Sequence, residues 1–159
     1  MGAGEVHHVL ANSNLSDGHF RVLKHGDTFA VFDSYGDMRS SQNGESGMYH
    51  EGTRFLSLLV LELEDERPFL LRSTVRDDND QLVVALTNPD LCRDGYVYMP
   101  VGTVHLMWRK LLWQGALYQE LQIENHGMTA ADFGIRMEFA ADFADIYEVR
   151  GMRRRTGEE

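Results

Sequence analysis

The sequence predicts an all-β fold, an antiparallel β-sandwich with little or no helix. Three observations support this prediction. Apolar and polar residues alternate over many short segments, clusters of turn-forming residues separate these segments, and no segment shows helical periodicity with a cap. The longest alternation places five apolar residues at every second position, at Ala131, Phe133, Ile135, Met137 and Phe139. Antiparallel strands joined by short turns are typical of two sheets packed face to face.

The first two strands are expected at residues 19–24 and 28–32. His25-Gly26-Asp27 lies between them and supplies a short turn, so the two segments form a hairpin. A second turn follows at residues 33–37, which are rich in residues that bond their own backbone or accept a positive φ. Residues 40–47 are polar and predict a loop.

The longest apolar run extends from Phe55 to Leu63 and predicts one strand that is buried on both faces. One face would carry Leu56, Leu58 and Val60, and the other Phe55, Leu59, Leu61 and Leu63. A helical segment is the alternative, but the neighbouring segments all favour strands. Asp65 to Pro68 would end the strand, because proline cannot donate to a ladder.

The remaining strands are expected at residues 69–76, 81–87, 101–114, 117–125 and 131–139. The first two are joined at Asp77-Asp78-Asn79-Asp80, four turn formers in succession. The third and fourth form the clearest hairpin, around Gln114-Gly115-Ala116.

The composition of the 159-residue chain fits one domain, with residues 1–18 as a flexible arm and residues 19–159 as the sandwich. A formal net charge of -10 argues against nucleic acid and anionic membranes as partners. The single cysteine, Cys92, excludes an internal disulfide and fits a reducing compartment. No apolar run approaches the roughly 20 residues of a membrane helix, and the start lacks a secretion signal. We therefore expect a cytoplasmic protein.

Acidic side chains near the end of the chain are candidates for acid–base chemistry, because glycoside hydrolysis needs two carboxylates beside the scissile bond. Asp142, Asp145 and Glu148 would lie on a strand, where positions three apart face opposite sides. Asp142 and Glu148 would share a face but stand ~20 Å apart, beyond the roughly 5–10 Å of a catalytic pair. We therefore expect no catalytic residue here, and assign Asp142, Asp145, Tyr147, Glu148 and Arg150 to a domain interface.

No metal and no cofactor are expected. His7 and His8 are neighbours in the predicted arm, and no histidine or cysteine spacing matches a known metal site. Asp77, Asp78 and Asp80 would attract calcium, but their loop lacks the glycine and the distal glutamate of an EF-hand. A solvated turn is the alternative that we favour.

Four residues are candidates for sugar binding. Trp108 and Trp113 flank two cations, and the apolar face of a sugar ring stacks on aromatic side chains, but core or interdomain packing would also explain a tryptophan. Tyr49 and Arg54 lie where a loop enters the long apolar run, and such loops often bind ligands. Pairing of the arginine with a carboxylate for structural reasons is the alternative.

Several motifs resemble a known family when they are taken in order. They are residues 47–57 (GMYHEGTRFLS), 86–91 (LTNPDL), 117–120 (LYQE) with Asn125, and 142–151 (DFADIYEVRG). The chain from about Leu23 to Gly157 is similar to the N-terminal domain of bacterial and archaeal glycogen debranching enzymes of the amylo-α-1,6-glucosidase type. One position departs from the pattern, because Gly52 stands where the family usually has an aspartate.

The resemblance implies a β-sandwich that precedes an (α/α)6-barrel glucosidase domain, so the chain would be truncated before that barrel. The catalytic carboxylates of the family belong to the barrel. This chain alone would then be an inactive module that packs on the glucosidase domain and helps shape its cleft. An autonomous α-glucan-binding module, using Tyr49 with Trp108 or Trp113, is the alternative, and a small hydrolase using the terminal carboxylates is disfavoured. The isolated domain would expose its interface and self-associate.

Overall fold

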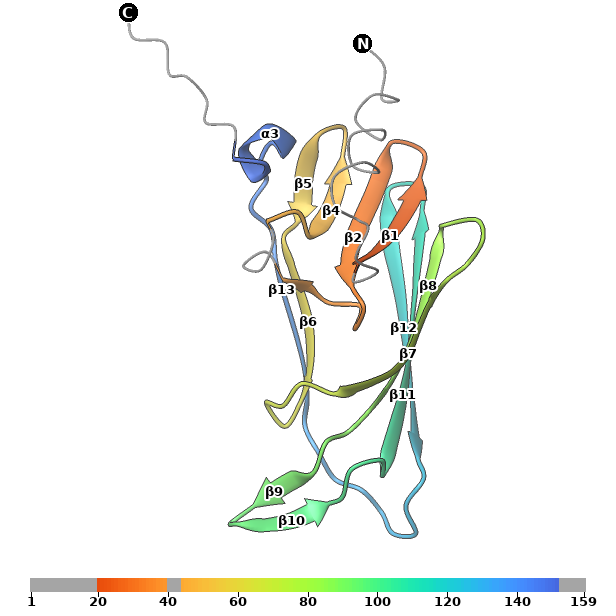
Figure 1. The fold of residues 1–159 in the computed structure, drawn as a ribbon, viewed down its shortest axis with the longest axis vertical. Coiled ribbons are helices and arrows are strands. Elements are labelled where there is room, and N and C mark those ends of the chain that lie inside the picture. Colours follow the sequence, from red (N-terminus) through yellow and green to blue (C-terminus); the bar gives the residue numbers. More distant parts are fainter. Residues whose placement is uncertain (1–19, 40–43, 152–159) are drawn as a thin grey trace, which may run out of the picture.

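The computed structural model describes residues 20–39 and 44–151 (Figure 1). The predicted arm at residues 1–18 and part of the loop predicted at 40–47 lie outside the described residues. Within them the fold is all-β, which confirms the predicted class, and it contains strands β1 to β13 and one short helix, α3. None of the helical residues in the described ranges forms a helix long and apolar enough to cross a membrane.

The described part of the chain forms four antiparallel sheets. The largest has the order β12 (Ala116–Asn125), β11 (Val104–Trp113), β8 (Gln81–Thr87) and β7 (Phe69–Val75). A second has the order β13 (Ile135–Ala140), β6 (Leu58–Leu63) and β3 (Met38–Arg39). A third has the order β1 (Phe20–His25), β2 (Thr28–Asp33), β4 (Gly47–His50) and β5 (Thr53–Leu56). The last is a two-stranded sheet of β9 (Leu91–Arg93) and β10 (Tyr96–Met99). Helix α3 spans Ile146–Val149.

The predicted hairpins are confirmed. In the β11–β12 pair Trp113 lies opposite Ala116, so a two-residue turn remains at Gln114-Gly115. Both turn residues have positive φ angles, 47° and 75°, which is the geometry of a type I′ turn. In the β1–β2 pair His25 lies opposite Thr28, and the turn is Gly26-Asp27.

The prediction of one continuous strand from Phe55 to Leu63 is wrong. The chain leaves β5 at Leu56 and enters β6 at Leu58, and these strands belong to different sheets. Ser57 lies at the crossing, where its N–H donates to the carbonyl of Ala140 at 2.8 Å. The apolar alternation continues through Ser57 without a sequence signal, because both sheets bury side chains of this run.

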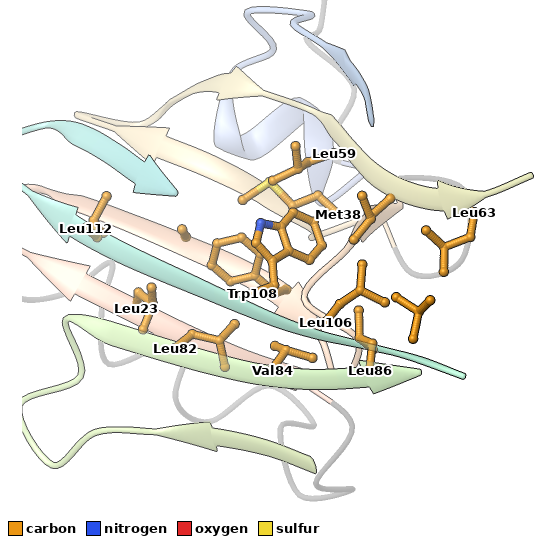
Figure 2. Close-up of a cluster of buried hydrophobic side chains, with 14 of the residues drawn as sticks. Leu23, Met38, Leu59, Leu63, Leu82, Val84, Leu86, Leu106, Trp108 and Leu112 are labelled. Atoms are coloured by element: carbon orange, nitrogen blue, oxygen red, sulfur yellow. The ribbon is translucent and has the colours of Figure 1, made fainter. Parts of the chain in front are cut away.

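The core lies between the largest sheet and the second and third sheets, with Trp108 of β11 at its centre (Figure 2). Leu82, Val84 and Leu86 of β8 and Leu106 and Leu112 of β11 line one side. Leu23, Phe32, Met38, Leu59, Leu61 and Leu63 line the other. Each such side chain is almost fully buried, and burial of one stabilises the fold by about 1.5–3 kcal/mol. The alternation predicted for β6 is therefore confirmed on its core face.

Candidate functional site

The segment of residues 142–150 is not a strand, so the predicted strand geometry of its carboxylates is wrong. After β13 the chain runs irregularly to Asp145, which is the N-cap residue of α3. The Asp145 side chain accepts a hydrogen bond from the Tyr147 N–H at 2.8 Å, and the Asp145 N–H donates to Glu148 Oε2 at 3.3 Å. This reciprocal arrangement is a capping box. Asp145 and Glu148 therefore meet on one helical turn, where each satisfies a backbone donor.

Asp142 is held by Arg54 of β5. Arg54 Nε donates to both carboxylate oxygens, at 3.1 and 3.2 Å, and Nη2 also binds Oδ2. Planar two-point pairing of this kind is stronger and more directional than a single ion contact. The hydrogen bond from Arg54 holds the pKa of the Asp142 carboxyl below its ordinary value, and the same bond raises the pKa of Arg54. Asp142 is thus a charged acceptor with a fixed partner, which does not suit a proton donor.

The rest of the Arg54 guanidinium ties down the segment before β4. Nη1 donates to the carbonyl of Gly44 at 2.9 Å and to that of Ser46 at 3.2 Å. Gly47 lies directly against the arginine, since a Cβ at this position would stand 2.5 Å from Arg54 Cδ. Glycine at position 47 therefore leaves the space through which Arg54 reaches Asp142.

Tyr49 is buried in a second hydrophobic cluster beneath α3. Its ring stacks on Phe29 at a centroid distance of 4.8 Å, and Val31 and Ile146 complete the cluster. The Tyr49 hydroxyl donates to the carbonyl of Glu45 at 2.8 Å. Burial raises the pKa of this phenol. The family motif around Tyr49 and the terminal motif are therefore two halves of one packed unit.

Backbone contacts join these halves as well. The Ile146 N–H donates to the carbonyl of Gly52 at 2.8 Å, and the Arg54 N–H donates to that of Ala144 at 2.9 Å. Gly52 has a φ of 83° in the turn between β4 and β5, a conformation that glycine adopts at no steric cost. Glycine at position 52 therefore suits the left-handed position of this turn.

Arg150 and Tyr147 differ in their surroundings. Arg150 lies over the same unit, with Nε 4.0 Å from Glu45 Oε1. Its buried Nη2 atom has no hydrogen-bond partner among the described residues. Tyr147 is exposed, as are Phe55 and Phe143, whose rings meet edge to face at 5.8 Å. The outward side of the terminal segment is therefore aromatic, while its carboxylates contact groups of the same domain.

The four sugar-binding candidates do not come together. Trp108 is fully buried in the core, and Tyr49 and Arg54 are buried in the unit beneath α3. Trp113, at the end of β11, is exposed and has the His25 ring at 4.2 Å. The exposed Tyr118 lies on the same face of the sheet, since Leu111 opposes Tyr118 and Trp113 opposes Ala116. The sequence signal for this exposure is that Tyr118 falls on the same face of β12 as Glu120, Gln122 and Glu124.

No metal centre is formed by the described side chains, among which no three histidine, cysteine, aspartate or glutamate residues converge. Asp77, Asp78 and Asp80 lie in the turn between β7 and β8.

Comparison with protein-family models identifies the family of this chain. A model of the N-terminal domain of some glycogen debranching enzymes matches residues 23–159. A search of curated proteins and a search of solved structures each found no significant match. The matched range covers nearly the whole chain. It includes Arg54 and Asp142, the residues of the Tyr49 cluster, and the capping box. The chain therefore belongs to the family of N-terminal domains found in some glycogen debranching enzymes.

Proposed function

We propose that this chain is a non-catalytic domain of an amylo-α-1,6-glucosidase, and that it packs on the glucosidase domain and helps shape the substrate cleft. One observation carries the non-catalytic part of the proposal. Asp142, Asp145 and Glu148, the carboxylates of the terminal family motif, bind Arg54 and the backbone of their own domain. A catalytic acid and base need carboxyl groups that are free to reach one bond.

The surface that we assign to the glucosidase domain is the aromatic patch formed by Phe55, Phe143 and Tyr147. All three side chains are exposed, the rings of Phe55 and Phe143 meet edge to face, and interface centres are enriched in aromatic residues. Phe143 has a positive φ of 52°, an uncommon conformation for a bulky residue. Such local strain is typical of functional positions, where the surrounding structure fixes it.

The single free cysteine, Cys92, fits a cytoplasmic enzyme.

Binding to a separately produced glucosidase domain of a debranching enzyme of this family tests the proposal. We expect saturable binding in a calorimetric titration, and at least a tenfold loss of affinity for Phe143→Ser, since truncating an aromatic anchor removes a large share of contact energy. Tyr96→Ser is the matched control, because Tyr96 is an exposed aromatic residue on β10, outside the patch, and should leave affinity unchanged. No saturable binding, or equal losses for both variants, would contradict the proposal.

An α-glucan-binding surface is a second candidate, and the exposure of Trp113 and Tyr118 is the observation that favours it. Their register makes them diagonal neighbours on β11 and β12, roughly 7–8 Å apart. Arg109 and Gln122, paired at 3.3 Å on the same face, would add polar contacts for sugar hydroxyl groups.

Titration of maltooligosaccharide against tryptophan fluorescence tests this candidate. The chain has two tryptophans, and the buried Trp108 remains as an internal reference in Trp113→Ala. A saturable change that disappears in this variant would support sugar binding at Trp113. A flat titration of the unmodified chain would exclude it.

A further inference from the structure

The sandwich is open along one side, between β12 and β13. β12 ends the largest sheet and β13 ends the second sheet. Within residues 20–39 and 44–151, β12 pairs with β11 alone and β13 with β6 alone. Residues 126–134 connect β12 directly to β13, so the two free edges belong to consecutive strands of the chain. Only alternate residues of an edge strand direct their N–H and C=O groups away from the partner strand, so about half of the ten residues of β12 and of the six of β13 present unpaired backbone groups there.

Side chains that point toward the core from β13 are exposed to solvent. Ile135, Met137 and Phe139 lie opposite Leu63, Leu61 and Leu59 of β6, respectively, and opposed residues share a face of the sheet. The three leucines are at most 2% exposed, whereas Ile135, Met137 and Phe139 are 40%, 39% and 72% exposed. The core face of β6 is thus covered by the largest sheet, and the same face continues uncovered onto β13.

The inner face of β12 shows the same discontinuity. Ile123 lies opposite the buried Leu106 of β11, yet is itself exposed. Gln119 is also exposed on this face, and it accepts a hydrogen bond at 2.8 Å from the fully buried Lys110 ammonium. On β12, as on β13, side chains that face the core are therefore exposed to solvent, here Ile123 and Gln119.

We propose that this side accepts β-strands from the polypeptide that follows this domain in debranching enzymes of the family, which rests on the proposed function. A strand added to an edge satisfies its free backbone groups and covers alternate side chains, whereas a helix covers only side chains. Long, flat edges with apolar side chains are rare in closed domains, because they pair with other chains.

The chemistry of the edge defines the incoming strand. Its inward face must be apolar at every second position to cover Ile123, Met137 and Phe139. Its outward face would meet charges of both signs on β12 and β13, since Glu120, Glu124 and Glu138 are exposed there, Arg136 is exposed beside Glu138, and Arg109 lies 3.6 Å from Glu120. Among residues 152–159 only Met152 is apolar, so we assign the covering strands to the polypeptide beyond them.

Hydrogen exchange measured by mass spectrometry tests the proposal. The 159-residue chain is compared with the same chain fused at Glu159 to the polypeptide that follows this domain in a debranching enzyme of the family. We expect backbone amides of β12 and β13 to exchange at least tenfold more slowly in the fusion. Unchanged exchange would overturn the proposal, as would protection that rises with concentration in the unfused chain, since a second copy would then be the occupant.

Two matched variants of the fusion separate strand addition from general stabilisation. Phe139→Lys places a charge on the inner face of β13 and should remove the added protection. Phe69→Lys changes a residue of β7, at the opposite edge of the largest sheet, that is 51% exposed, and should retain it. Equal behaviour of the two variants would overturn the proposal. Binding that still depends on Phe143 while the edge stays unprotected would refute strand addition and leave the proposed function intact.

Discussion

Replacement of Arg54 by methionine removes the side chain that joins three segments of the packed unit. Methionine keeps much of the apolar volume but loses the bonds to Asp142 and to the carbonyls of Gly44 and Ser46. Asp142 would then keep its charge without its partner. We expect the terminal segment to loosen from β5, because the Arg54–Asp142 pair is its main polar contact with that strand.

The expected loss in the free energy of unfolding of Arg54→Met follows from these hydrogen bonds. A hydrogen bond that involves a charged group contributes about 1.5–3 kcal/mol, and Arg54 is buried. The Asp142 side chain is 37% exposed, so water recovers part of the loss on that side. We expect Arg54→Met to lower the free energy of unfolding by about 3 kcal/mol, a large share of the roughly 5–15 kcal/mol of a typical domain.

The loss of stability caused by Arg54→Met should be smaller in acid than at neutral pH. Arg54 lowers the pKa of folded Asp142 below 3.8, its ordinary value. The unfolded chain therefore binds this proton at a higher pH than the folded chain does. The stabilisation is present above the unfolded pKa and is lost as pH falls through the folded pKa, so the difference between the two proteins should shrink in acid.

Urea denaturation at about pH 7 and about pH 3 measures both quantities. Asp142→Asn and the double variant complete a thermodynamic cycle, in which a coupling of about 1 kcal/mol or more is expected between residues in contact. An Arg54→Met protein as stable as the unmodified chain would refute the structural role of the pair. A stability difference that is constant between the two pH values would refute the charged state of Asp142.

Three further variants probe other parts of the fold. Asp145→Ala should cost about 1 kcal/mol in urea denaturation through loss of the N-cap, whereas Asp132→Ala, at an exposed site, should be neutral; equal effects would refute the capping role. Lys110→Met should raise stability at pH 7 by removing a charge that burial disfavours. Burial lowers the pKa of Lys110 below 10.5, so the unmodified chain gains stability as pH rises toward that value. The stability advantage of Lys110→Met should therefore shrink as pH rises toward 10.5. A constant advantage would contradict the buried charge as its cause. Gly47→Ala should cost about 3 kcal/mol or more in thermal unfolding, because a Cβ would stand 2.7 Å from the Leu56 carbonyl oxygen; a Tm near that of the unmodified chain would contradict the steric argument.

Local patterns predicted those parts of the fold that local physics determines. The Gln114-Gly115 turn required two positive φ angles, and the flanking alternation set the register of β11 and β12. The break at Ser57 had no such signal, because apolar residues on both sides of it are buried in different sheets. Alternation also predicted which side chains of β13 face the core, but could not show that the space opposite them is open.

The candidate site was predicted less well, because its contacts join distant parts of the chain. Arg54 and Asp142 lie 88 positions apart, so the sequence allowed a structural pairing for Arg54 without naming its partner. The capping box had a local signal in Asp145-x-x-Glu148. The dense alternation of carboxylates and apolar residues around it predicts a strand instead, and a strand would separate two side chains that meet on one turn.

Release of glucose from a glycogen limit dextrin tests the central proposal most directly. It is measured for the 159-residue chain and for its fusion to the following polypeptide of a debranching enzyme of the family. We expect no release above background by the chain alone and clear release by the fusion. Activity of the chain alone, abolished by Asp145→Asn without loss of the fold, would contradict the account.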